Sequence, residues 1–569
     1  MNSINLRHAI RMLTTILLIC AITACGGGSG VSTSLTPANL TISVVPASII
    51  DAQTGWTQAS MRGTVHYYCD CGTGASGTCV AGDDANAGTS SSAPRRTIAN
   101  AITLMASLSG TNTVALCQGG AFNAAASLNG AYAPGCAAGT TCTDLREYSP
   151  PSNDTAKPII TMATNNNLFH LEENRGGVRI FNLKLIGDNA PADMNNIAFF
   201  FYNGVHDIEI GNLDIVNFST GMDNENGGAS PTSNISMTGN TFTNNSRFAY
   251  YGGSSGTKIN YNVFESSGNS TSLVHTIYEN NYGSIAYGVE IIGNYIHGQY
   301  GSTCLGSVLS SHGAIDGLKV QHNIVTIDSA STTGGCYGLE FSNQTNDTHP
   351  TFFKNAVFSG NTIINGGNTA LLVTTCPGCI IENNLIISDW SYNGNINGIV
   401  VPAIVHRAQD VISDANIVRN NTVWFGPNVT GTGVGIVTNS EGTGHIISNN
   451  TVSSVQGSGT LNCFRHDLAL TSYAFMDNNH CYGTVTTHYE YTHGTNLAAW
   501  QTYTSSYGFD AHSIGGAPMF ASAASTGSYN FHPNTGSPLI GAGNNVNMST
   551  LDFAGVTRPS SPAIGAFEP

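Results

Sequence analysis

A short phrase of apolar and polar positions recurs nine times between Met237 and Tyr482. It places one apolar residue three positions before an asparagine and another two positions after it. The intervals between successive asparagines are 22, 32, 29, 38, 23, 37, 29 and 29 residues, a spacing typical of repeat architectures. The nine asparagines are Asn240, Asn262, Asn294, Asn323, Asn361, Asn384, Asn421, Asn450 and Asn479. Each copy therefore predicts one unit of a repeat protein.

The flanking apolar residues predict two short strands with side chains directed inward, and the asparagine lies at the bend between them. One unit cannot bury its apolar face alone, whereas parallel stacking buries a continuous core and lets the asparagines bond as a ladder. The pattern predicts an all-β protein, a right-handed parallel β-helix of about eleven rungs. Two earlier rungs contain Asn182 and Asn212 one position late, so aligning the apolar residues places Phe181 and Gly211 in the ladder position.

Helical patterns flank the repeats. Residues 93–105 place four apolar residues on one helical face and predict a short amino-terminal capping helix. A second short helix is expected near Asn496–Trp500, and the tail from Pro518 is expected to pack on the carboxyl end. We expect residues 1–24 to be a lipoprotein signal, 25–60 a lipidated cysteine and tether, 61–160 an amino-terminal cap with the first rungs, 161–485 the β-helix, and 486–569 carboxyl-terminal loops and cap.

Composition agrees with many short turns around a packed core. Only 9% of residues are charged and 66 are glycine, while 41% are hydrophobic. Regularly placed apolar residues at this abundance exclude a disordered chain.

The first 24 residues have the pattern of an export signal. Arg7 and Arg11 precede an apolar run from Met12 to Ile22, which is too short to span a membrane as a mature anchor. The ending before Cys25 resembles a bacterial lipobox. The resemblance implies lipidation of Cys25, and Gly26 after it fits sorting to the outer membrane of Gram-negative bacteria. A plain secretory signal is the alternative.

The charge balance bears on partners. Removing the signal deletes two arginines and no acid, which leaves 16 basic against 34 acidic residues and a net charge of −18. Nucleic acid is therefore excluded as an expected partner. A polyanionic glycan would be repelled unless Ca²⁺ bridges it or a local basic patch dominates. We expect a monomer that binds polysaccharide.

Twelve of the 14 cysteines remain if Cys20 is removed and Cys25 is lipidated, an even number in an oxidising compartment. Cys376-Pro-Gly-Cys379 is also compatible with a redox or zinc motif, although a lone pair in an exported repeat protein favours a disulfide. The candidate pairs are Cys136 with Cys142, Cys304 with Cys336, Cys376 with Cys379, and Cys463 with Cys481, which leaves Cys69, Cys71, Cys79 and Cys117 for the amino-terminal region.

Both ends of the repeat region resemble a broad family of exported right-handed parallel β-helix proteins, the pectate-lyase-like superfamily. The amino-terminal match is Gly82-Asp-Asp-Ala-Asn-Ala-Gly-Thr89, and the carboxyl-terminal match combines Asp552, Gly555, Arg558-Pro559 and Ile564-Gly-Ala-Phe-Glu568. The resemblance spans roughly residues 65–569. It implies the fold, while its known members include polysaccharide lyases, other glycan-active enzymes and proteins of unassigned role.

Two outward faces contain candidate chemistry. Lys258, Glu290 and Lys319 each precede a ladder asparagine by four residues and should lie side by side, either as an exposed ion-pair ladder or as part of a site. The strands that begin the rungs offer Arg247, Glu279, His312 and Glu340. Glu225, Arg247 and Glu279 each precede their asparagine by fifteen residues, which predicts a stack of acid, base and acid. The resemblance favours this first strand face.

β-Elimination of a uronate requires a base near the sugar C5 proton and a group that stabilises the carboxylate. Lys258, Lys319 or His312 is the candidate base, and Arg247 would hold the carboxylate. The candidate Ca²⁺ ligands are Asp223, Glu225 and Glu279. A polysaccharide lyase is therefore the favoured hypothesis.

Two alternatives remain open. A glycoside hydrolase needs two carboxylates, for which Glu279 and Glu340 are the candidates. The adjacent aspartate pair of polygalacturonase-like hydrolases is missing from the sequence. A non-catalytic glycan-binding or adhesin-like protein would instead use aromatic stacking platforms, for which the candidates are Tyr250, Tyr251, Tyr295, Tyr300 and Trp424.

Overall fold

The computed structural model describes twelve segments of the chain, all within one compact unit that runs from Thr41 to Pro569. These segments are residues 46–130, 136–162, 166–188, 196–225, 230–268, 275–298, 303–343, 349–403, 410–439, 441–493, 496–523 and 529–569. The predicted signal, the tether before residue 46 and the lipidation at Cys25 lie outside them. In the described segments no helix is long and apolar enough to cross a membrane.

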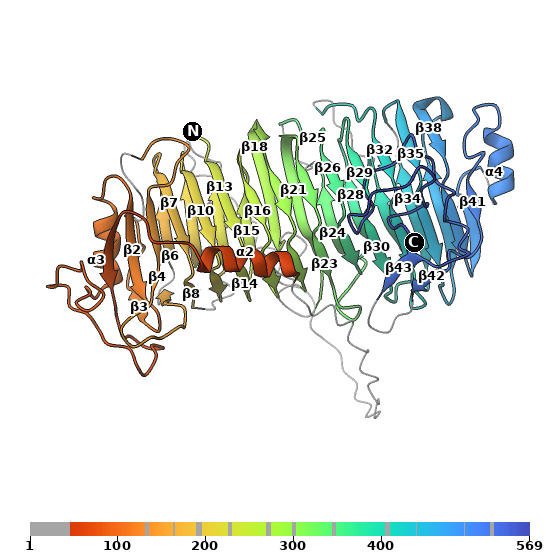
Figure 1. The fold of residues 1–569 in the computed structure, drawn as a ribbon. Helices are drawn as coiled ribbons and strands as arrows, with labels where there is room; N and C mark the ends of the chain where they lie inside the picture. Colours follow the sequence, from red (N-terminus) through yellow and green to blue (C-terminus); the bar gives the residue numbers. More distant parts are fainter. Residues whose placement is uncertain are drawn as a thin grey trace, which may run out of the picture. The chain divides into compact units, whose positions relative to one another are not determined.

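Three long parallel sheets, here called A, B and C, wrap one apolar core, and the chain visits them in turn (Figure 1). Sheet A contains β1 (Thr64–Tyr68), β2 (Asn112–Cys117), β4 (Thr143–Tyr148), β7 (Gly176–Phe181), β10 (His206–Gly211), β13 (Ser233–Thr238), β16 (Lys258–Asn260), β19 (Glu290–Ile292), β22 (Lys319–Gln321), β26 (Val357–Ser359), β29 (Ile380–Glu382), β32 (Ile417–Arg419), β35 (His445–Ser448) and β38 (Tyr473–Asp477).

Sheet B contains β3 (Ala121–Ala124), β5 (Ile159–Met162), β8 (Lys184–Ile186), β11 (Asp214–Val216), β14 (Thr241–Thr243), β17 (Val263–Glu265), β20 (Tyr295–His297), β23 (Ile324–Thr326), β27 (Thr362–Ile364), β30 (Leu385–Ser388), β33 (Thr422–Phe425), β36 (Thr451–Ser454), β39 (His480–Gly483) and β41 (Ile514–Gly515).

Sheet C contains β6 (Asn167–Leu171), β9 (Ile197–Tyr202), β12 (Thr220–Glu225), β15 (Phe248–Gly252), β18 (Ile277–Tyr287), β21 (Gly306–Asp316), β24 (Cys336–Phe341), β28 (Thr369–Val373), β31 (Asn395–Val400), β34 (Thr432–Thr438), β37 (Thr460–His466) and β40 (Thr486–Glu490), with β25 (Phe352–Lys354) paired to β21. A separate antiparallel pair joins β42 (Phe520–Ser522) to β43 (Asn530–Pro533).

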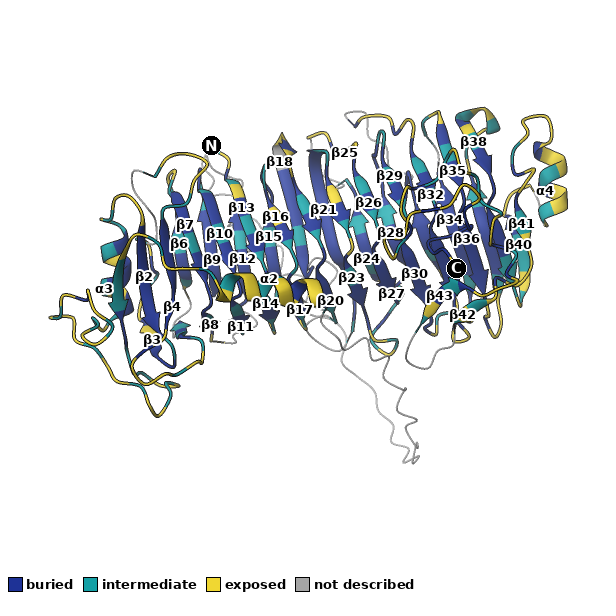
Figure 2. Cartoon of the chain, in the orientation of Figure 1, coloured by how far each residue is buried: buried dark blue, intermediate teal, exposed yellow. Residues whose placement is uncertain are grey.

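This strand order confirms the predicted parallel β-helix. Sheets A and B each contain 14 strands, more than the about eleven rungs that the sequence predicts. The difference arises because the first rungs lack the asparagine phrase and are therefore not counted. Figure 2 shows strands that are largely buried, with the exposed residues mostly in the connections and on the helices.

The nine predicted asparagines form one continuous ladder. The Nδ2 of each of the first eight donates to the side-chain oxygen of the next asparagine at 2.9–3.1 Å, and that of Asn479 donates to Asp510 at 3.3 Å. Every member is buried. Each Nδ2 also donates to a main-chain carbonyl of the preceding rung, as Asn323 does to Ile291 at 2.8 Å. The ladder satisfies polar groups at every bend inside the solenoid.

The predicted ladder position of the two earlier rungs is wrong. Ile210 pairs with Met237, so the residue in register with Asn240 is Leu213, and by the same pairing Leu183 occupies that position one rung earlier. Both leucines are fully buried. The displacement is two residues because Ile208 and Ile210 both face the core, so the apolar pattern alone does not tell which of them pairs with Met237.

The residue before each ladder position turns the chain with a left-handed backbone. Examples are Gly239 at φ 71° and Asn420 at φ 52°, and asparagine and glycine tolerate this region best. The side chains at these positions point outward along the corner between sheets A and B; we call them the corner row. The row contains Asn182, Asn212, Gly239, Tyr261, Gly293, His322, Gly360, Asn383, Asn420, Asn449 and Asn478.

Helix α2 (Ala47–Thr57) covers the first part of the corner row. Asn182 donates to the Trp56 carbonyl at 3.0 Å, and Gln53 donates to the Gly239 carbonyl at 3.0 Å. Because a Cβ at Gly211 would lie 2.0 Å from the Trp56 ring, that position requires glycine. The helix is therefore part of the solenoid wall (Figure 1).

The carboxyl-terminal tail covers the last part of the corner row, along the side of four rungs. Asn383, Asn420, Asn449 and Asn478 donate to tail carbonyls at 2.8–3.4 Å. Buried Arg558 binds Glu568 at 2.5 Å and the Asn383 oxygen at 2.9 Å, which gives the carboxyl-terminal motif a structural role.

Helices close both ends of the core. In α3 (Ile98–Met105) the buried face is Ile98, Ala101, Ile102 and Met105, as predicted, and Thr97 caps its amino end. Near the other end, α4 (Leu497–Thr504) begins at the Asn496 cap and buries Trp500, and a 3-10 turn (Leu470–Ser472) precedes β38.

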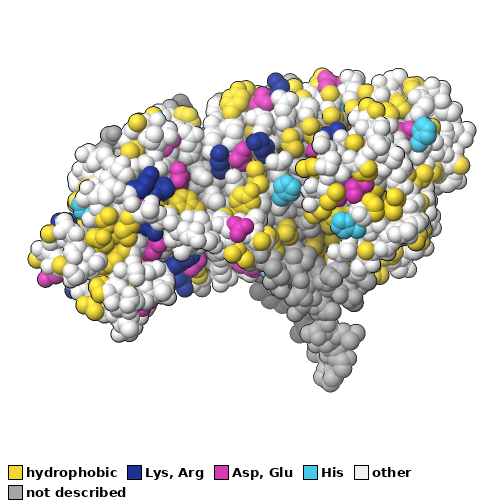
Figure 3. All heavy atoms as spheres, in the orientation of Figure 1, with side chains coloured by type: hydrophobic (Ala, Val, Ile, Leu, Met, Phe, Trp, Pro, Cys, Tyr) yellow, Lys and Arg dark blue, Asp and Glu magenta, His cyan; other side chains and the backbone are white. Residues whose placement is uncertain are grey.

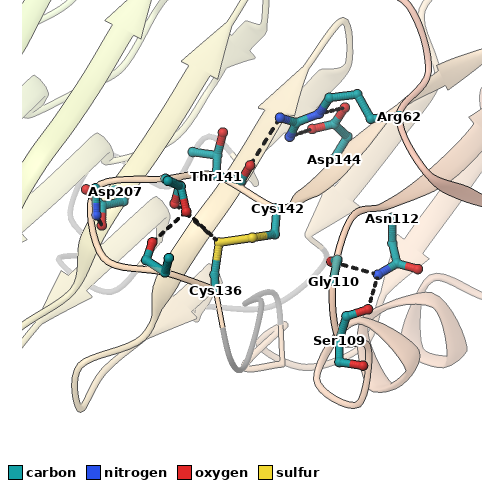
Figure 4. The surroundings of a disulfide bond; sticks show 12 residues. Arg62, Ser109, Gly110, Asn112, Cys136, Thr141, Cys142, Asp144 and Asp207 are labelled. Atoms are coloured by element: carbon teal, nitrogen blue, oxygen red, sulfur yellow. Dashed lines mark hydrogen bonds and ion pairs between the residues drawn. A yellow bond between two sulfur atoms is a disulfide. The ribbon is translucent and has the colours of Figure 1, made fainter.

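All twelve cysteines in the described segments form disulfides. The four predicted pairs are present, and the amino-terminal four pair as Cys69 with Cys117 and Cys71 with Cys79. Figure 4 shows the Cys136–Cys142 bond beside the ion pair of Arg62 with buried Asp144. The Cys376–Cys379 disulfide leaves no thiol of this pair free to bind zinc.

The ladder can be tested by substituting Asn323. Asn323→Ala removes two hydrogen bonds that its amide donates and two that its oxygen accepts from Asn294, all buried. We expect the free energy of unfolding to fall by about 3 kcal/mol, measured by denaturant titration. Exposed Asn393→Ala is the matched control and should change stability by less than about 0.5 kcal/mol. Equal effects of the two substitutions would contradict a structural role for the ladder.

Candidate functional site

The lysine face of sheet A is an ion-pair ladder. Strand register places Glu290 between Lys258 and Lys319, with nitrogen to oxygen distances of 3.8 and 3.0 Å. Partial burial opposes ionisation, but the hydrogen bond from Lys319 and the charge of Lys258 lower the pKa of Glu290. The lysine side chains are 49% and 50% exposed, so each pair contributes at most about 1 kcal/mol. Figure 3 likewise shows basic beside acidic side chains on the face that carries α2.

The outward side of sheet C brings more of the candidate residues together. We define the site face as the outward side chains of β12, β15, β18, β21 and β24. One register row of this face contains Asp223, Tyr251, Tyr278, Ser310 and Glu340. His312 lies in β21 two residues after Ser310, and it pairs with Asn280 of β18.

Aromatic rings pack continuously across this face. The Tyr251 and Tyr278 rings stack at 5.4 Å, and His275 stacks on Tyr278 at 5.0 Å. His312 meets the Tyr278 ring edge to face at 5.3 Å. At the preceding rung, the Arg247 guanidinium lies 5.0 Å from the Phe248 ring centre, a cation–π contact that holds the cation on the face.

Hydrogen bonds fix the tautomers of the two histidines. The Nδ1 of His275 lies 2.7 Å from the Ser307 carbonyl, and that of His312 lies 2.5 Å from the Ser342 carbonyl. A carbonyl only accepts, so each Nδ1 carries a proton, and in the neutral ring the Nε2 is the acceptor nitrogen. For His312 the Nε2 lies 3.3 Å from the Ser310 hydroxyl. Burial lowers the pKa of His275 to about 4, which keeps its ring neutral at neutral pH.

Glu340 is oriented by two hydroxyls. Ser307 donates to its Oε2, and Ser342 donates to its Oε1 at 2.9 Å. The carboxylate is half-buried beside Tyr337, whose pKa is raised by burial and by the Glu340 charge. Ser307 and Ser342 thus fix the position of the Glu340 carboxyl group at one end of the site face.

Glu279 does not belong to the site face. It follows Tyr278 in the strand, so its side chain points into the solenoid, where it is fully buried. Burial raises the pKa of its carboxyl well above the usual range. The candidate hydrolase pair of Glu279 and Glu340 therefore does not converge, because the two side chains lie on opposite sides of sheet C.

The predicted stack of Glu225, Arg247 and Glu279 is also wrong. Gly252, not Arg247, pairs with Glu279, because the connections between these strands and their asparagines differ in length. The predicted Ca²⁺ ligands do not fit together either, since Asp223 points outward and Glu279 inward. The side chain of Glu225 and all of Tyr300 lie outside the described segments.

The aromatic candidates divide between the core and the surface. Tyr250 and Trp424 are buried, and Tyr295 packs with Ile49 of α2. Sequence reasoning missed Tyr278, His275 and Ser342, although alternation along each strand marks Tyr278 as outward once its neighbour Ile277 is placed in the core. Cavities of about 220 and 200 Å³ lie elsewhere, beside Trp424 and Phe520 and beside Cys69 and Tyr148.

The burial of His275 can be tested by measuring the pKa of its imidazole. Because burial disfavours the charged ring, its imidazole should titrate near pH 4, measured by NMR of histidine-labelled protein with His275→Asn to assign the signal. His297 is the internal control, since a hydrogen bond to Glu265 raises its pKa above the ordinary 6.5. A His275 titration at or above that of His297 would contradict the described packing.

Comparison with known proteins finds structural likeness at low identity. No family model matches the chain, and no curated protein sequence does. The A-module of a mannuronan C-5 epimerase from Azotobacter vinelandii is 12% identical over 72% of this chain and 92% of its own, with a TM-score of 0.35. A surface adhesin of Streptococcus pneumoniae is 11% identical over 69% and 87%, with a TM-score of 0.39.

A rhamnogalacturonan lyase is 13% identical over 73% of this chain and 87% of its own, with a TM-score of 0.32. At such values these similarities carry no argument about activity. The parallel β-helix of this chain follows from its own strand pairing.

Proposed function

We propose that the protein binds a uronate-containing polysaccharide along the site face and cleaves it by β-elimination. The observation that carries the proposal is the pair of histidines, His275 and His312, with fixed Nδ1–H tautomers on either side of Tyr278. A neutral imidazole with an acceptor Nε2 is suited to remove a proton. Stacked aromatic rings beside it suit the apolar faces of sugars.

In the proposed reaction, His312 Nε2 takes the C5 proton of a uronate. The electron pair of the C–H bond forms the C4–C5 double bond as the bond from C4 to the glycosidic oxygen breaks. The leaving oxygen takes up one proton, for which the Tyr278 hydroxyl is the candidate donor. No oxidant or reductant is needed, and the products are one chain with an unsaturated uronate at its new non-reducing end and a second chain with a new reducing end.

Arg247 supplies the positive charge that this chemistry requires. A carboxylate acquires negative charge as C5 loses its proton, and a fixed cation stabilises that state. Phe248 holds the Arg247 guanidinium on the face at 5.0 Å. The net negative charge of the chain repels a polyanionic glycan. Binding is therefore expected to depend strongly on Arg247 and on the salt concentration.

Hydrolysis is less compatible with the geometry. Asp223 and Glu340 are the carboxylates on the described row, and four strand spacings separate them, roughly 19 Å at ~4.8 Å per strand. Glycosidase carboxylates lie about 5–9.5 Å apart. The described pair is therefore too distant to act on one glycosidic bond.

A non-catalytic glycan-binding protein is the second candidate. The continuous aromatic packing of Tyr251, Tyr278 and His275 favours it, because stacking platforms bind sugars without chemistry. Under either function we further propose a monomer anchored in the outer membrane through lipid on Cys25. No step of the proposed reaction passes through Ca²⁺, and a chelator arm of the assay tests that point.

The reaction can be tested with a panel of uronate polysaccharides, following the ultraviolet absorbance of unsaturated products with and without chelator. His312→Gln should lower kcat/KM about 100-fold or more, because it removes the base. Arg247→Gln should raise the salt sensitivity and lower kcat/KM as well. Melting temperatures of the variants check that they are folded.

Two controls separate the faces of the solenoid. Lys319→Ala tests the lysine face, and Lys157→Ala removes a remote lysine that pairs with Asp214 at 2.8 Å. Both should stay within about twofold of the unaltered protein. Binding without unsaturated product would favour the non-catalytic candidate, and a loss in Lys319→Ala equal to that in His312→Gln would reject the site face.

A further inference from the structure

A cavity lies on the outer side of sheet B, under the carboxyl-terminal tail. Register aligns Trp424 of β33, Ser453 of β36 and Tyr482 of β39 in one row. The residue before each of them lies in the apolar core, so this row points outward. All three residues line a cavity of about 220 Å³, which residues 517–520 cover. Because Ser453 is small and its two neighbours in the row are large, the row leaves a gap above the serine.

The hydroxyl of Ser453 is unpartnered at the base of this cavity. Within the described segments no hydrogen-bond partner reaches its Oγ, and the residue is only 2% exposed. The neighbouring Ser454 differs, since its hydroxyl donates to Gln456 Oε1 at 2.8 Å. A buried hydroxyl gives up its bonds to water and destabilises the folded state unless a new partner replaces them. Ser453 therefore offers one hydrogen bond to a ligand in the cavity.

The remaining walls of the cavity are apolar. Val455, Pro518, Met519 and Phe520 line it together with the two aromatic residues of the row, and no charged side chain is among its described lining residues. A charged molecule, or a sugar with several hydroxyls, would lose its hydrogen bonds to water there without replacing them. The cavity therefore suits a neutral and mostly apolar ligand with one polar group, unlike the glycan of the site face.

The dimensions of the cavity fit a single planar ring. Trp424 and Tyr482 are two strand spacings apart, roughly 9.6 Å at ~4.8 Å per strand. A ring midway between them would lie roughly 4.8 Å from each, within the range of about 4.5–7 Å for packed aromatic rings. An apolar cavity of about 150 Å³ is large enough to hold benzene. The cavity of about 220 Å³ therefore admits a six-membered ring with a small substituent.

The cover of the cavity is fixed by hydrogen bonds and leaves an opening. Met519 has a left-handed backbone with φ 49°, which is strained for a residue with a long side chain. The Asn534 amide donates to its carbonyl at 2.9 Å, and the Ser537 hydroxyl donates to the Pro518 carbonyl at 2.6 Å. The side chains of Met519 and Val455 are 46% and 39% exposed. A ligand can therefore enter a preformed cavity beside these two residues.

We propose that this cavity binds one neutral aromatic ring that bears a hydroxyl, a molecule of the phenol class. The ring packs between Trp424 and Tyr482, and its hydroxyl forms a hydrogen bond with Ser453 Oγ. A planar ring gains dispersion contacts on both of its faces, and the hydroxyl satisfies the buried serine. The proposal is independent of the proposed glycan cleavage, because the cavity lies on sheet B and shares no residue with the site face.

The test titrates the full mature chain with p-cresol and, separately, with toluene, which has the same ring and methyl group but no hydroxyl. By calorimetry we expect a dissociation constant of about 1 mM or lower for p-cresol and one about tenfold higher for toluene. Ser453→Ala should weaken p-cresol binding about tenfold and leave toluene binding unchanged, because it removes only the hydroxyl. The exposed Ser458→Ala is the matched control and should keep the preference for p-cresol.

A second variant and a crystal structure locate the ligand. Ser453→Leu fills the gap between the two aromatic side chains and should abolish binding of both molecules, with a melting temperature to show that it is folded. Crystals of the unaltered protein soaked in p-bromophenol stay informative if this variant does not fold. We expect an anomalous bromine peak in the cavity and the phenol oxygen within hydrogen-bond distance of Ser453 Oγ. Water alone in the cavity, or equal p-cresol affinity of folded Ser453→Leu and the unaltered protein, would overturn the proposal.

Discussion

The hydrogen bond between successive ladder asparagines is the interaction on which the rest of the structure depends. It lets the chain turn sharply between sheets A and B without leaving buried polar groups unpaired. The turn also needs a left-handed residue directly before each ladder position. That residue points outward, so the same bend that closes the core creates the corner row, to which α2 and the carboxyl-terminal tail bind.

The alternation of side chains along each strand then separates scaffold from chemistry. In β18, Ile277 and Glu279 face the interior while Tyr278 and Asn280 face outward. One residue of difference in register therefore decides whether a carboxyl is buried beside Tyr250 or presented to a ligand. The outward and inward side chains belong to the same strands, so packing that fixes one side also positions the other.

The sequence was sufficient for the fold, because nine asparagines and their apolar neighbours recur at regular offsets. It was sufficient for α3 and for four disulfides, which depend on local spacing. It failed for Leu213, because Ile208 and Ile210 both face the core and either could be aligned with Met237. It failed for the alignment of Arg247 with Glu279, because connections of unequal length separate the ladder from sheet C. Tyr278 and His275 were missed for the same reason: their direction depends on a register that only long-range strand pairing determines.

We propose that the protein binds a glycan on the outer side of sheet C, across β12 to β24. The most direct measurement is a crystal structure of His312→Gln with a uronate oligosaccharide from the substrate that the panel identifies. We predict sugar rings on Tyr251 and Tyr278, with a carboxylate near Arg247 and C5 near position 312. An oligosaccharide bound along Lys258 and Lys319, or on the carboxyl-terminal tail, would contradict it.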